Sequence, residues 1–302
     1  MPLRRRDKVA FVFRLRRALV LLPVLGATVA MAAVAQSQAP AGDYGGGAII
    51  PPPDSIFDAG NVSIGLHTTS DGKVQVLGYM GAKCQTAFIR ASATRRADGS
   101  FSVAGTAHAT TPAASLITKY EISGTVAGAE AHGTAKATTK VKSSGGTTRE
   151  CDSGSHDWQA RRPGGAIGTP GPGTAGAQLY GTTSQRIGKT HQPIVLRLSA
   201  DGTKLRRVLY TLNNRCSQAT LHERGVIDRN VKIAGNGKVS NVLKTTQKTT
   251  GGVRSRSVQR FSGKVGSEGA AGKLSVKSNF INASGHTFAS CSTGTVTWKA
   301  AP

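Results

Sequence analysis

The sequence predicts an all-β protein built from two tandem antiparallel domains, each with one disulfide. Three observations predict it: apolar and polar residues alternate with a period of two, Asp-Gly and Asn-Gly dipeptides fall between the alternating runs, and both halves repeat one spacing of Cys, Gly and Trp. Each half is most simply a small β-sandwich. A partly closed β-barrel is the alternative, because the period of two does not separate the two architectures.

The first 35 residues have the composition of a secretory signal peptide. Basic residues at positions 4–17 precede an apolar run at 18–34, and the sequence Ala-Val-Ala at 33–35 fits the small-x-small rule for cleavage. The alternative is an uncleaved membrane anchor, because the apolar run is close to the lower limit of about 17 residues for a spanning helix. We expect cleavage after Ala35, no stable membrane insertion afterwards, and a secreted or cell-surface protein.

Two segments rich in Gly and Pro divide the remaining chain. Residues 36–57 are expected to form a flexible stalk, and residues 163–177 a linker that lets the two halves reorient. The domains between and after these segments are then residues 58–162 and residues 178–302. We expect no amphipathic helix of useful length in either domain.

The two halves share a skeleton of turn, cysteine and glycine positions. The first half has Asp71-Gly72, Cys84, Asp98-Gly99, Gly124, Gly133, Cys151, Gly154 and Trp158, and the second has Asp201-Gly202, Cys216, Asn236-Gly237, Gly263, Gly272, Cys291, Gly294 and Trp298. The two glycines are nine residues apart in both copies, and Cys and Trp are seven apart. Such matched spacing indicates a tandem duplication.

The four cysteines are expected to form disulfides, because an exported chain folds in an oxidising compartment. The repeat favours Cys84 with Cys151 and Cys216 with Cys291, although the sequence alone does not exclude crossed pairs. Closing a loop of about 70 residues in this way stabilises a domain by about 4 kcal/mol in the chain-entropy model.

The stretch CDSGSHDW at residues 151–158 places a serine beside a histidine, as a hydrolase site would. The second copy, CSTGTVTW, has Thr293 at the position of Ser153 and Val296 at the position of His156. Only Cys, Gly and Trp recur, and these residues serve a disulfide, a turn and a core. We therefore predict no catalytic residue, and a hydrolase with a site at the domain cleft is kept as an alternative.

The sequence contains no pattern that indicates a bound metal or cofactor. Its histidines are scattered without an HxH or HExxH pair, its cysteines are assigned to disulfides, and it has no phosphate-binding glycine motif. We expect neither a metal nor a cofactor.

Positive charge is concentrated in the second half. Residues 164–302 carry 20 basic and 4 acidic side chains, a net charge of +16, whereas residues 36–163 carry 12 and 10. If Phe261 and Val265 face the core, strand parity places six cations on the solvent face of one hairpin. These six are Arg254, Arg256, Arg260, Lys264, Lys273 and Lys277. Such a face attracts polyanions because binding releases their counterions.

This pattern indicates a non-enzymatic binding or adhesion module of the cell envelope, whose second domain contacts an anionic envelope polymer or an acidic polysaccharide. Specific nucleic-acid binding is not expected, because no aromatic residues are interleaved with the cations for bases to stack on. The alternative is a passive extracellular domain whose charge serves only solubility. The sequence predicts neither the oligomeric state nor the identity of the ligand.

The second half also resembles a recurring domain in uncharacterised secreted proteins of actinobacterial type. The resemblance rests on YGTTSQ at residues 180–185, the run LRLSADGTKL, Cys216, FSGKV and the closing CSTGTVTW, and it covers residues 178–299. The first half matches more loosely and lacks the YGTTSQ opening, so the resemblance does not predict a full first strand there. It implies an exported, disulfide-closed β domain and no particular activity.

Overall fold

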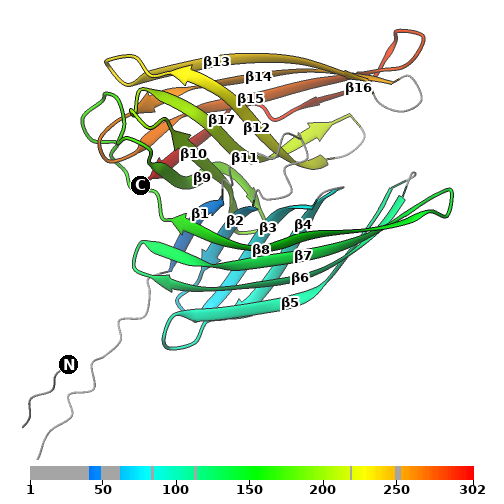
Figure 1. Cartoon of the computed structure of the whole chain (residues 1–302), viewed down its shortest axis with the longest axis horizontal. Coiled ribbons are helices and arrows are strands. Elements are labelled where there is room, and N and C mark those ends of the chain that lie inside the picture. The colour runs from blue at the N-terminus through cyan, green and yellow to red at the C-terminus, as the bar shows by residue number, and fades with distance from the viewer. Residues whose placement is uncertain (1–40, 49–61, 83–84, 112–113, 218–219, 249–252) are drawn as a thin grey trace, which may run out of the picture. The chain divides into compact units, whose positions relative to one another are not determined.

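A computed structural model describes residues 41–48, 62–82, 85–111, 114–217, 220–248 and 253–302 (Figure 1). By its internal contacts the chain divides into residues 1–35 and residues 36–302. All described residues lie in the second unit, so the predicted signal peptide lies outside them. The described residues contain no helix that is long and apolar enough to cross a membrane.

The described chain is all-β, as predicted. The first half contains β1 (Gly42–Ala48), β2 (Val62–Thr68), β3 (Lys73–Ala82), β4 (Gln85–Thr94), β5 (Ser100–Thr111), β6 (Ala114–Ala127), β7 (Glu130–Ser143) and β8 (Thr148–Arg161). The second contains β9 (Gln178–Ile187), β10 (Thr190–Leu198), β11 (Lys204–Cys216), β12 (Thr220–Lys232), β13 (Lys238–Lys248), β14 (Arg254–Val265), β15 (Ala270–Ile281), β16 (Thr287–Ser292) and β17 (Val296–Ala301).

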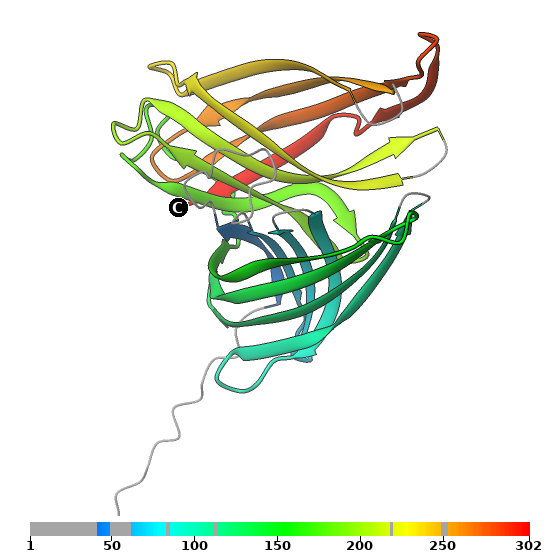
Figure 2. The same cartoon turned by 45° about the vertical axis from the view of Figure 1, so that its right-hand side comes forward.

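Each half forms one continuous antiparallel sheet. The first has the strand order β4-β3-β2-β1-β8-β7-β6-β5, and the second repeats it as β12-β11-β10-β9-β17-β15-β14-β13. In the second sheet β16 pairs with both β11 and β15. The first sheet is therefore a nearly closed barrel and the second is closed and barrel-like, so the barrel is the architecture observed of the two that the sequence left open (Figure 2).

Two separate apolar cores fill the barrels, each around one of the two tryptophans. Trp158 and Trp298 are both 1% exposed, and each lies near a phenylalanine, Phe101 or Phe261. The repeated glycines make room for the indole rings: a Cβ on Gly124 would lie 2.6 Å from the Trp158 ring, and one on Gly272 would lie 2.7 Å from the Trp298 ring. The repeated glycines and tryptophan therefore have the same structural role in both halves, which is to bury the indole ring in the core.

The predicted stalk is wrong for residues 42–48, because these residues form β1. This strand pairs with β2 and β8, and its Tyr44 is fully buried in the first core. The sequence did not predict this strand because residues 45–47 are all glycine, which has low strand propensity and no side chain to alternate. They are needed for close packing: a Cβ on Gly46 would lie 2.0 Å from the Gln159 carbonyl oxygen, and one on Gly181 of β9 would lie 1.9 Å from that of Lys299. The first half therefore has the first strand that the resemblance did not predict.

The predicted linker is fixed along part of its length. Gly171 donates a backbone hydrogen bond to Val265, Gly173 donates one to Gly202, and the Ile167 carbonyl accepts one from Glu268. These bonds attach residues 167–173 to the second barrel, so this part does not provide the expected freedom of reorientation.

The four turn dipeptides all place their glycine at positive φ, from 70° to 84°, but only two of them make hairpins. Asp71-Gly72 joins the paired strands β2 and β3, and Asp201-Gly202 joins β10 and β11. Asp98-Gly99 joins β4 to β5 and Asn236-Gly237 joins β12 to β13, and these strands end the two sheet orders. The hairpin prediction fails there because a turn sequence does not specify whether the strands that it joins also pair.

The disulfide between Cys216 and Cys291 is confirmed, and it links β11 to β16. Cys151 on β8 is also disulfide-bonded, and Cys84, its predicted partner, lies outside the described residues. A disulfide is typical of proteins that fold in an oxidising, extracytoplasmic environment.

Candidate functional site

The six cations predicted to share a solvent face all lie exposed on β14 and β15. Along β14 the exposed residues Arg254, Arg256, Arg260 and Lys264 alternate with residues that face the barrel interior. On β15 Lys273 and Lys277 are exposed, while Leu274 and Val276 between them are buried.

The strand register brings these cations side by side. Lys277 is paired with Val258, and Lys273 is paired with Ser262, so both lysines lie on the outward side of β14. Neighbouring strands are about 4.8 Å apart, and outward residues repeat about every 7 Å along a strand. The charges therefore form rows that an extended polymer can follow.

Four further cations belong to the same face, and the sequence analysis missed them. Lys238, Lys244 and Lys248 are exposed on β13 and are paired with outward residues of β14, and Lys299 on β17 is paired with Ala271. The sequence feature that could have identified the three β13 lysines is the period-two alternation in KVSNVLKTTQK, which places them on the same face of the strand. We call all ten residues the basic face; β13, β14 and β15 run next to each other in Figure 2.

No acidic residue occurs on the strands that carry the basic face. The sequences of β13, β14, β15 and β17 contain neither Asp nor Glu. Across the described residues, none of the ten cations belongs to an ion pair. Their charge is therefore open to an external anion.

The first barrel does not repeat this face. When the glycine pairs of the two copies are superimposed in register, Ile117 takes the place of Arg256 and Glu121 takes the place of Arg260. Lys140 lies 3.4 Å from the carboxylate of Glu150. The equivalent strands of the first barrel do carry exposed lysines, Lys119, Lys136, Lys140 and Lys142, but Glu121 and Glu150 lie exposed among them. Among the described strands, a basic face without carboxylates is thus mainly a property of the second barrel.

Ser153 is held in a structural role. It is 5% exposed, its Oγ accepts a hydrogen bond from the Ala137 backbone N–H at 2.8 Å, and it donates one to the Gly154 carbonyl at 2.7 Å. His156 contacts the Ser153 carbonyl oxygen, not Oγ. These contacts do not assemble the serine and histidine into a nucleophile and base.

The second copy makes the same two hydrogen bonds with Thr293. Its hydroxyl accepts from the Val276 N–H at 2.9 Å and donates to the Gly294 carbonyl at 2.9 Å. A side-chain hydroxyl therefore bridges the irregular part of the strand in both copies. The comparison of the two repeats counted only identical residues, so it did not identify Ser153 and Thr293 as equivalent.

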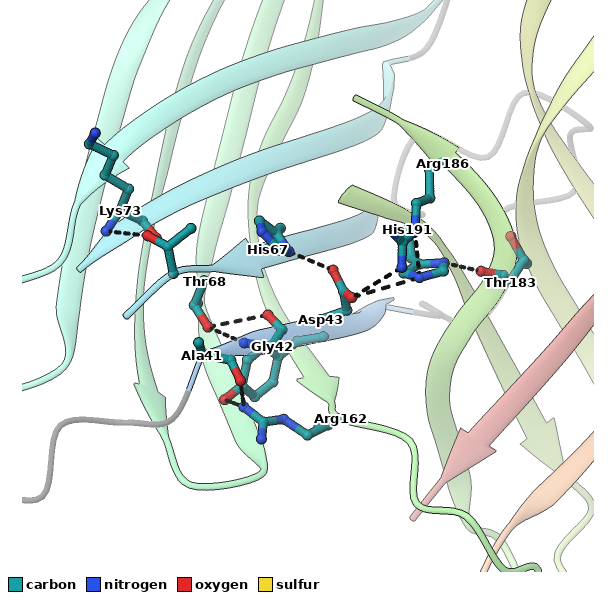
Figure 3. Close-up of polar contacts among 12 residues, drawn as sticks. Ala41, Gly42, Asp43, His67, Thr68, Lys73, Arg162, Thr183, Arg186 and His191 are labelled. Atoms are coloured by element: carbon teal, nitrogen blue, oxygen red, sulfur yellow. Dashed lines mark hydrogen bonds and ion pairs between the residues drawn. The ribbon is translucent and has the colours of Figure 1, made fainter. Parts of the chain in front are cut away.

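A second polar cluster ties the two barrels together at Asp43 (Figure 3). Its carboxylate lies 2.9 Å from Nδ1 of His67 on the neighbouring strand, and Arg186 and His191 of the second barrel approach its other oxygen at 3.9 and 3.7 Å. The Arg186 Nε–H donates to His191 Nε2, so the other ring nitrogen donates to the Thr183 carbonyl. The contacts of the cluster are hydrogen bonds and ion pairs among its own members, which join strands of the two barrels.

Glycines let the barrels meet closely beside this cluster. A Cβ on Gly45 would lie 1.9 Å from the Gly181 carbonyl oxygen, and one on Gly65 would lie 2.6 Å from that of His191. The Tyr79 hydroxyl donates to buried Gln192 at 2.9 Å. The strands β1 to β3 thus contact β9 and β10 as a close-packed structural interface.

The described residues contain no group of three or more His, Cys, Asp or Glu side chains that could hold a metal ion. The chain matches no protein-family model and no curated protein.

Proposed function

We propose that this chain is a secreted or cell-surface binding protein without enzymatic activity, and that its basic face holds an anionic polymer of the cell envelope. One observation carries the proposal: ten exposed cations lie on four adjacent strands that contain no carboxylate. A polymer that binds there releases its condensed counterions, so the affinity should fall steeply as salt rises.

The chemistry of the face favours a flexible polyanion over a base-stacking ligand. The outward positions of these strands carry no aromatic side chain, because Phe261 and Trp298 lie in the core and Phe280 has the inward parity of buried Leu274. Wall teichoic acid and acidic polysaccharides present phosphate or carboxylate groups along an extended chain. Lysine and arginine in rows can contact several such groups at once.

The test compares two variants that lose equal charge. The face variant changes Arg254, Arg256, Arg260, Lys264, Lys273 and Lys277 to Gln, and the control changes the exposed residues Arg149, Lys189, Lys204, Arg206, Arg215 and Lys232 to Gln. We expect the face variant to elute from heparin and from immobilised teichoic acid at much lower salt than the control. Equal losses in both variants would instead support a passive domain whose net charge serves only solubility.

A further inference from the structure

The second barrel contains a cavity at one end of its interior. Its volume is about 380 Å³, and it lies between β11, β12, β13, β14 and β15. Sites for small molecules in proteins have volumes of about 300–1,000 Å³, and eight-stranded barrels are wide enough to hold one such ligand.

The described lining of the cavity includes six uncharged polar side chains. These are the side chains of Tyr210, Gln247, Ser255, Ser257, Gln259 and Ser278. The serines and Gln259 on β14 have the same inward parity as buried Phe261, so the interior changes from apolar to polar along one strand.

The polar lining is pre-organised by hydrogen bonds between its own members. The Tyr210 hydroxyl donates to Gln259 Oε1 at 2.8 Å, and the hydroxyls of Ser257 and Ser278 are 2.8 Å apart. These bonds leave the Gln259 amide N–H groups and the second lone pairs of the Ser257 and Ser278 hydroxyls to meet a ligand. Val276 and Phe280 supply apolar surface in the same wall.

The first barrel shows that the fold does not require this lining. Its hydroxyl pair is kept, with Thr118 and Thr139 at 2.9 Å. At the register positions of Ser255 and Gln259, however, it has Leu116 and Tyr120, which are larger and pack on or beside the first core. The duplication therefore supplies an internal comparison: at these two described positions, the second copy has smaller or more polar inward side chains than the first.

We propose that this cavity binds a small uncharged sugar. Among the described side chains that line it, only the phenol of Tyr210 is ionisable, so these side chains offer a charged ligand no counter-charge for the hydration that it would lose. A neutral sugar offers hydroxyls to the serine and glutamine groups, and it offers its C–H surface to Val276 and Phe280. This site is independent of the basic face, whose side chains point to the other side of the same sheet.

The binding test uses amide chemical shifts of the ¹⁵N-labelled protein during titration with glucose, N-acetylglucosamine and glucuronate. We expect saturable shifts for residues 255–259 and 276–280 with at least one neutral sugar, and weaker binding of glucuronate at the same amides. The net positive charge alone would favour glucuronate, so preference for the neutral sugar reports the cavity. No saturable shift with either neutral sugar, or tighter binding of glucuronate at these amides, would overturn the proposal.

Two variants test the site residues. The double change Ser255→Leu and Gln259→Tyr introduces the residues that the first barrel has there, and it should weaken sugar binding at least tenfold. Because the larger residues could disturb folding, the double change Ser257→Ala and Ser278→Ala removes the hydroxyl pair without adding volume, and it should weaken binding in the same direction. The control Arg256→Gln should lower heparin retention and leave sugar affinity unchanged. Unchanged sugar affinity in both double variants would contradict the assignment.

Discussion

Single hydroxyl groups hold the strand irregularity that each copy has between its second cysteine and its tryptophan. Ser153 and Thr293 each accept one backbone N–H and donate to the carbonyl of the next residue. The resemblance of CDSGSHDW to a reactive serine is therefore a consequence of backbone geometry. A nucleophile would need its hydroxyl directed at a base, and here it is directed at the main chain.

Removing the Ser153 hydroxyl should lower the stability of the fold. Ser153→Ala leaves the buried N–H of Ala137 without its acceptor, so we expect the free energy of unfolding to fall by about 1–3 kcal/mol. Ser153→Thr should be close to neutral, because the second copy uses threonine for the same two bonds. Urea denaturation of the three proteins measures both effects, and equal stability of the alanine variant would show that the bond contributes little.

The side chain of Asp201, in the turn between β10 and β11, makes the stability of the folded state depend on pH. The Ser199 hydroxyl and then the Thr203 backbone N–H lower the pKa of Asp201 to about 2. Because the pKa in the folded state lies below the ordinary value, the stabilisation is present above about pH 4 and is lost as the pH falls toward 2. Asp71 in the first copy has its pKa lowered in the same way, chiefly by Thr69.

We predict that the stability of the Asp201→Asn variant falls less between about pH 4 and pH 2 than the stability of the unchanged protein. An asparagine keeps an acceptor for the Thr203 N–H but does not titrate. Melting temperatures of both proteins between about pH 2 and 5 provide the measurement. Parallel curves for the two proteins would show that the turn does not couple to protonation.

At the scale of elements, glycine positions in strands β1 and β9 decide how the barrels pack. Gly45 and Gly181 allow two strand backbones to meet with no side chain between them. Glycine lowers strand propensity, but this packing requires it, because any Cβ at Gly45 or Gly181 would overlap a carbonyl oxygen of a neighbouring strand.

Gly45→Val should therefore disturb the contact between the barrels and leave each sheet intact. Its Cβ would lie within 1.9 Å of the Gly181 carbonyl oxygen. We expect a larger radius of gyration by small-angle scattering, with an unchanged far-ultraviolet circular dichroism spectrum. Gly165→Ala is the control, because nothing lies within 4 Å of its added Cβ. If the radius of gyration of the valine variant is unchanged, the contact at Gly45 does not determine how the barrels pack.

The alternation in the sequence predicts strands such as β14 and β15 well, because inward Phe261 and Leu274 are apolar and the residues beside them are charged. It does not predict β1, because three consecutive glycines carry no side-chain pattern. It also does not separate a sandwich from a barrel, since a strand that is buried on one face has the same period in both. The cavity depends on which inward residues of five strands meet, and that information lies in the register.

At the scale of the whole molecule, duplication has produced two similar barrels with different surfaces and interiors. The cores keep tryptophan, paired glycines and a hydroxyl in both copies, so these positions maintain the fold. The two copies differ at outward positions, where the second has more cations, and at inward positions, where the second has serine and glutamine. Binding functions are expected where the copies differ, because positions shared by both are explained by folding.

The most direct test of this account is a map of the polymer-binding surface. A heparin oligosaccharide should be titrated into the ¹⁵N-labelled protein at low and at physiological salt, with amide shifts assigned to residues. We expect salt-sensitive shifts concentrated on β13, β14, β15 and β17, with little change on β5 to β8 of the first barrel. Shifts spread evenly over both barrels, or absent from β14, would contradict it.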